Sequence, residues 1–157
     1  MSEPSALPSP VESELFYKAL IVILDVAAII GFGLAPSVQG VAVCLFIAIL
    51  TLGLESSLVA VVANRWQHDV TSIEFFQYFG GAMVTWNQIE IIVSVFLATI
   101  NFWSFVLLTR LSMIGLIAGY FFLPGVATAL IIALLITDAI TTRKLSTQLD
   151  ADDYTQI

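Results

Sequence analysis

The chain has 157 residues, of which 59% are hydrophobic and only 11% are charged. A soluble domain carries about 25% charged residues, so this chain could not cover its own surface in water and is expected to lie in a membrane. The net charge of −7 argues against a nucleic-acid partner, which needs basic patches, and the single cysteine, Cys44, excludes an internal disulfide framework.

The chain opens with residues 1–14, which are rich in serine and proline and include three glutamates. A segment of this composition buries too little apolar surface to fold, so we predict a disordered cytoplasmic tail. It has no positively charged beginning and is therefore not expected to be a cleaved secretory signal.

Four long apolar runs follow, and a membrane-spanning helix needs about 20 such residues. We expect residues 111–116 to form a turn, and Pro124 to kink the last helix near its outer end. The sequence therefore predicts an all-α membrane protein, a four-transmembrane-helix bundle over residues 15–145 with short lumenal or extracellular turns. The predicted spans are 17–34, 40–63, 89–108 and 117–140.

The basic residues predict the orientation. If the helices alternate, Lys18, Arg65, Arg143 and Lys144 lie on one side of the membrane and Arg110 alone lies on the other. Because cytoplasmic segments carry the excess of basic residues, both termini and the loop between the second and third spans should be cytoplasmic. We expect a multi-pass protein of the plasma membrane or of endomembrane vesicles.

The loop between the second and third spans, residues 64–87, is only partly polar. Its apolar residues repeat at helical spacing, which is typical of a short helix lying on the inner membrane surface. Capping of the bundle is the favoured interpretation and lipid sensing is the alternative, because cationic residues are too few for strong binding to anionic lipid. The apolar residues are Trp66, Val70, Ile73, Phe76 and Phe79.

Each predicted span carries one carboxylate: Asp25, Glu55, Glu90 and Asp138. A charge in hydrocarbon is costly, so such residues normally face the interior of a bundle. At 100° per residue, two helices each show a small or polar stripe, and the simplest account is that these stripes meet and hydrogen-bond. The stripes are Cys44, Ala48, Thr51 and Glu55 on the second span and Glu90, Ser94, Leu97, Asn101 and Ser104 on the third.

Two interpretations of the carboxylates remain open, structural contacts and a proton or cation pathway through Asp25, Glu55 and Glu90. No basic residue lies deep in a predicted span, so we expect that not all of these groups are salt-bridged and that desolvation favours their neutral form. The structural interpretation is favoured because no inverted repeat is evident and the chain is small for a carrier.

Metal binding, cofactor binding and catalysis are not expected. His68 lies in the loop and Cys44 stands alone, so the carboxylates lack a second type of metal ligand. The sequence has no glycine-rich phosphate loop and no serine–histidine–aspartate set at one membrane depth.

Two short segments resemble the MARVEL family of tetraspan membrane proteins, in its chemokine-like-factor branch. Trp86–Ile92 places a tryptophan four residues before Glu90 at the start of the third helix, and Thr137–Ala139 precedes the basic pair of residues 143 and 144. The resemblance covers about residues 17–145. It implies a role in vesicle trafficking, membrane apposition and lateral association with other membrane proteins or sterol-rich lipid, without catalysis and without a defined binding residue.

The acidic tail, residues 146–157, ends in two short sequence patterns of the kind that cytoplasmic proteins recognise. Tyr154 and Ile157 have the spacing of a clathrin-adaptor signal, and Thr155 with the terminal Ile157 has the form of a PDZ ligand. An unbound, solvated tail is the favoured alternative to both.

Three functions therefore compete. The first is a MARVEL-like tetraspan that organises membrane or trafficking through contacts with lipid, with other integral membrane proteins or with itself. The second is an accessory subunit of a larger membrane complex, for which an apolar outer surface and short loops are equally suitable. The third is a small proton or cation channel or transporter, suggested by the intramembrane carboxylates.

Overall fold

The computed structural model describes residues 10–72, 85–113 and 118–154, and it describes side-chain surroundings for residues 15–72, 85–113 and 119–144. The described residues form helices and no strand, which confirms the predicted all-α four-helix bundle. The elements are α1 (Pro10–Leu34), α2 (Val41–Ala63), α3 (Gln67–Thr71), α5 (Trp86–Ser112) and α6 (Ala118–Tyr154).

The four long helices each contain a segment that is long and apolar enough to cross a membrane. Their mean hydropathies are 2.2 to 2.3, and each reaches the length of about 20 residues that the hydrocarbon core requires. The chain is therefore a multi-pass integral membrane protein. The four segments are Leu15–Leu34, Val41–Ala63, Trp86–Ser112 and Gly119–Lys144.

Three helices extend beyond the apolar runs that predicted them. α1 begins at Pro10, inside the predicted disordered tail, and proline suits the first helical position. α5 continues to Ser112, so residues 111 and 112 of the predicted turn are helical. α6 continues to Tyr154, through most of the predicted acidic tail. Hydropathy predicts where a helix leaves the membrane, but a helix can continue into water.

Local signals at the helix starts explain two of the boundaries. Thr85 forms a capping box: its side chain accepts a hydrogen bond from the Gln88 backbone N–H at 3.4 Å, and the Gln88 side chain accepts one from the Thr85 N–H at 3.1 Å. Gly40, immediately before α2, has a φ of 102°, a left-handed conformation that glycine adopts without steric cost.

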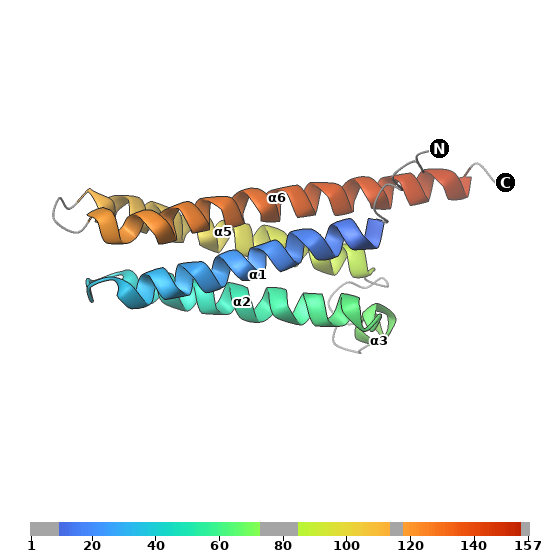
Figure 1. Ribbon diagram of the computed structural model, residues 1–157. Coiled ribbons are helices and arrows are strands. Elements are labelled where there is room, and N and C mark those ends of the chain that lie inside the picture. Colours follow the sequence, from blue (N-terminus) through green and yellow to red (C-terminus); the bar gives the residue numbers. More distant parts are fainter. Residues whose placement is uncertain (1–9, 73–84, 114–117, 155–157) are drawn as a thin grey trace, which may run out of the picture.

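The long helices form a ring in which each packs against two others. α1 packs against α2 and α6, and α5 packs against α6 and α2. Figure 1 shows the beginning of α1, the end of α6 and the short helix α3 at one end of the bundle, which we call the α3 end. The connection between α1 and α2 lies at the other end, which we call the turn end.

Each long helix buries one stripe of residues spaced alternately three and four apart. This is the spacing of helices that pack side by side with a small crossing angle. The buried seams are Lys18, Ile21, Asp25, Ala28 and Phe32 of α1; Val41, Cys44, Ala48, Thr51, Glu55, Leu58 and Val62 of α2; Glu90, Ser94, Leu97, Asn101, Ser104, Leu108 and Leu111 of α5; and Phe121, Pro124, Thr128, Ile131, Leu135, Asp138 and Thr142 of α6.

A glycine brings α1 and α6 close together at Pro124, which lies inside α6. A Cβ atom on Gly31 would lie 3.0 Å from Cδ of the Pro124 ring, so a larger residue would push the helices apart. The Thr128 hydroxyl donates a hydrogen bond to the Pro124 carbonyl at 2.8 Å.

The predicted surface helix is described only in part. α3 has five residues and contains Val70, while Trp66 directly precedes it and is largely exposed. Ile73, Phe76 and Phe79 lie outside the described residues. The membrane-surface helix therefore stays a prediction.

Candidate functional site

A buried ion network joins three helices near the α3 end. The ammonium group of Lys18 on α1 forms ion pairs with Glu90 of α5 and with Asp138 of α6, and Nζ lies 2.9 Å from Oδ2 of Asp138. The Ser94 hydroxyl donates a hydrogen bond to the same carboxylate oxygen at 3.2 Å. All four side chains are within 2% of complete burial.

As expected, Lys18 does not lie deep in its span, since it is the fourth residue of Leu15–Leu34, but its burial beside two carboxylates was not predicted. That residue stands at the beginning of the apolar run, which suggested an interfacial position. Because α1 begins at Pro10, Lys18 lies more than two turns inside the helix, on the face that also carries Ile21 and Asp25. The spacing of three and seven residues from Lys18 to these neighbours was the signal that could have placed it in the core.

Two further carboxyl groups lie in the interior without a hydrogen-bond donor. Asp25 of α1 and Glu55 of α2 are fully buried, and among the described residues none of their four carboxyl oxygens has a hydrogen-bond partner. The charges of Lys18, Glu90 and Asp138 act on Glu55, and Glu55 acts on Asp25. The ionisable groups therefore form one electrostatically connected set that reaches inward from the α3 end.

The polar stripes of α2 and α5 face each other, as predicted. The Asn101 side-chain amide donates hydrogen bonds to the Thr51 hydroxyl and to the Leu97 carbonyl, both at 2.9 Å. Nearer the turn end, the Cys44 thiol lies 3.8 Å from the Ser104 carbonyl oxygen, to which it donates. These contacts join α2 and α5 on the turn-end side of the ion network.

The core changes character along its length. At the turn end a cluster of apolar side chains fills the interior between all four helices, including Phe32, Val41, Leu111 and Phe121. A smaller apolar cluster lies around Ile21 and Leu135. Lys18 and the four buried carboxyl groups therefore lie on the α3 side of the apolar cluster at the turn end.

The predicted contact residues thus have different surroundings. Glu90 and Asp138 meet at Lys18, Asn101 meets Thr51, and Asp25 and Glu55 are buried without a donor. In the tail, Tyr154 is the last residue of α6, and residues 155–157, which include Thr155 and Ile157, lie outside the described part of the chain.

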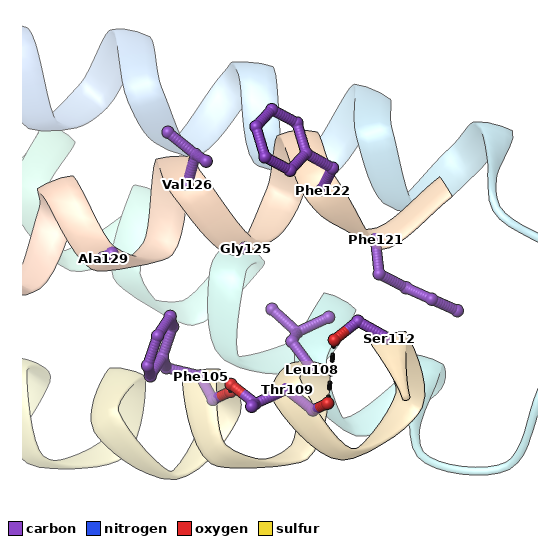
Figure 2. Close-up of a pocket in the computed structure, with 9 residues that line it drawn as sticks. All are labelled: Phe105, Leu108, Thr109, Ser112, Phe121, Phe122, Gly125, Val126 and Ala129. Carbon is purple, nitrogen blue, oxygen red and sulfur yellow. Dashed lines mark hydrogen bonds between the residues drawn. The ribbon is translucent and has the colours of Figure 1, made fainter. Parts of the chain in front are cut away.

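The outer surface of the bundle is apolar, and α5 and α6 form a groove on it. One pocket of the groove lies toward the turn end, with a volume of about 370 Å³, between two segments that face each other in Figure 2. A second pocket, of about 490 Å³, lies between the same helices and reaches Arg143. The first is lined by Phe105, Leu108, Thr109 and Ser112 of α5 and by Phe121, Phe122, Gly125, Val126 and Ala129 of α6.

Comparison with known proteins gives no relative: no protein-family model, curated protein or solved structure matches this chain.

Proposed function

We propose that this protein organises membrane through lateral contacts of its helices with lipid, with other integral membrane proteins or with itself, as its resemblance to MARVEL proteins implies. The α5/α6 groove is the observation that carries the proposal. A groove of this kind on the outside of a membrane bundle offers a concave, apolar surface to another helix or to lipid chains.

The composition of the outer surface supports this role. Large apolar side chains of all four long helices are exposed, including Ile30, Phe46, Trp103 and Phe122. Soluble proteins rarely expose such continuous apolar surface, which in a membrane is where lipid and partner helices bind. The connection between α1 and α2 spans only residues 35–40 and offers little surface outside the membrane.

The distribution of polar groups favours this role over a channel. A conduction path needs polar groups or water across the whole span. Here the ion network lies toward the α3 end, and the apolar cluster around Phe32 and Phe121 fills the turn end. We infer that the network serves to assemble the bundle, and that the bundle presents its outer face to partners.

Filling the groove tests the proposal. A Cβ atom added at Gly125 would meet no atom within 4 Å, so we expect Gly125→Leu to occupy the groove while the bundle still folds. Gly53 of α2 is equally unobstructed and lies outside the groove, so Gly53→Leu is the matched control. Membrane proteins that co-purify with the wild type in mild detergent should be lost with Gly125→Leu and retained with Gly53→Leu.

The same purification distinguishes the proposed organising role from the alternative function, an accessory subunit. A sparse, mixed set of membrane proteins and vesicle cargo supports an organising role, whereas partners at fixed stoichiometry support an accessory subunit of a larger complex. Equal recovery from both glycine variants would contradict a role for the groove.

The basic residues support a cytoplasmic α3 end. With Lys18 inside the bundle, the flanking residues Arg65, Arg143 and Lys144 still outnumber Arg110 on the other side. We place both termini in the cytoplasm and the protein in the plasma membrane or in endomembrane vesicles.

A further inference from the structure

The interior of the bundle contains more carboxyl groups than its cation can balance. Lys18 and Asp25 come from α1, Glu55 from α2, Glu90 from α5 and Asp138 from α6, and none is more than 2% exposed. If all five were ionised, three negative charges would be in excess. Each buried charge without a partner costs several kcal/mol, so the folded bundle must reduce this excess.

Glu90 and Asp138 are the two buried carboxylates that pair with Lys18. Both carboxylates lie in ion-pair contact with the ammonium group, and Asp138 also accepts a hydrogen bond from Ser94. A shared cation and a hydroxyl donor compensate for the loss of water around these two groups.

Asp25 and Glu55 lack such compensation. Their side chains are fully buried, and no described residue donates a hydrogen bond to any of their four oxygens. Burial disfavours a charge on both groups. At Glu55 the positive charge of Lys18 opposes this effect and the negative charges of Asp138 and Glu90 add to it, and at Asp25 the charge of Glu55 adds to it. A buried carboxyl group with neighbouring carboxylates and no donor is stabilised by binding a proton, because the neutral form needs less solvation.

We propose that Asp25 and Glu55 are a pair of proton-binding sites beside the network of Lys18, Glu90 and Asp138. Two bound protons reduce the excess to one negative charge, which both ion pairs of Lys18 share. The proton fits better than a metal cation, because it needs a single oxygen. Hard metal cations take six or more ligands, and among the described residues no group of three or more His, Cys, Asp and Glu side chains is placed to hold one.

Infrared spectroscopy of the full chain in lipid bilayers detects these protons directly. A protonated carboxyl group has a carbonyl stretching band that a carboxylate lacks, and this band shifts in heavy water. The wild type should show it at neutral pH. Asp25→Asn and Glu55→Gln should each remove one contribution, whereas Asp69→Asn, at an exposed residue of α3, should leave the band unchanged.

Replacing the Lys18 cation should have the opposite effect on the band. In Lys18→Met the Glu90 and Asp138 carboxylates lose their partner and should take up protons, so the band should grow. Circular dichroism of every variant checks that it remains helical. The band should grow in Lys18→Met even if that variant is less stable than the wild type.

The proposal is overturned if the wild type has no protonated-carboxyl band at neutral pH. It is equally overturned if the band survives the double variant Asp25→Asn/Glu55→Gln, since the protons would then lie elsewhere. A wild-type band that disappears on adding sodium at constant pH would assign the site to a metal cation instead.

Discussion

The Lys18 ammonium group connects α1 to α5 and α6, because Glu90 and Asp138 reach it from two different helices. Forming such a pair from hydrated ions gains little, since both partners lose water. Removing one partner is different, because it leaves the other charge buried and uncompensated. The network therefore selects one arrangement of the three helices more than it adds to the total stability.

Replacement of the cation should be strongly destabilising. Lys18→Met keeps an apolar stem of similar length but leaves two buried carboxylates without a counter-ion, so we expect a loss of about 3–5 kcal/mol. Unfolding in mixed micelles, followed by circular dichroism, measures it. Lys144→Met, at an exposed residue, should change the stability by less than about 0.5 kcal/mol. Equal stabilities for the two variants would mean that Lys18 does not hold the helices together.

Glu90 and Asp138 should each be replaceable on its own, but not both together. Glu90→Gln or Asp138→Asn alone leaves Lys18 with one carboxylate and a balanced charge, so each should cost about 1 kcal/mol or less. The double variant leaves a buried ammonium group without a counter-ion, and its loss should exceed the sum of the single losses by about 2 kcal/mol or more. A double-mutant cycle by the same unfolding assay measures this coupling, and additive losses would contradict a shared cation.

At the scale of the helices, hydropathy predicted all four spans, and the polar stripe of α5 followed from 100° per residue. Both are properties of one segment at a time. The partner of Glu90 and Asp138 depends on three segments together. Lys18 stands near the edge of its span, and only the arrangement of α1, α5 and α6 shows that its side chain is buried. Sequence reasoning also missed the contact of Gly31 with Pro124, because nothing local indicates which helix a glycine faces.

That glycine offers a test of helix packing. Gly31→Val should push α1 away from the Pro124 ring and cost about 1–3 kcal/mol, as overpacking does. Gly33→Val is the matched control two residues on, because a Cβ there meets no atom within 4 Å. Thermal unfolding in detergent should therefore separate the two variants, and indistinguishable transitions would show that α1 and α6 are not closely packed at this point.

At the scale of the molecule, an even number of spans places the beginning of α1 and the end of α6 at one end of the bundle (Figure 1). Tags at both ends of the chain should resist protease added to intact cells and should be cut after permeabilisation, since we place this end in the cytoplasm. Cleavage of one tag from outside would contradict four spans, and cleavage of both would reverse the orientation.

We propose that the bundle binds other membrane proteins or lipid at the α5/α6 groove on its outer surface. Site-specific photo-crosslinking in native membranes tests it most directly, with a photoreactive residue at Phe122 in the groove or at Phe46 on α2. Both side chains are exposed, by 73% and 65%, and both lie within the first two turns of helices that start at the turn end.

We expect defined adducts with membrane proteins or lipid from Phe122, abolished by Gly125→Leu, and only diffuse lipid labelling from Phe46. Identical labelling from both positions, unaffected by Gly125→Leu, would contradict binding at the groove.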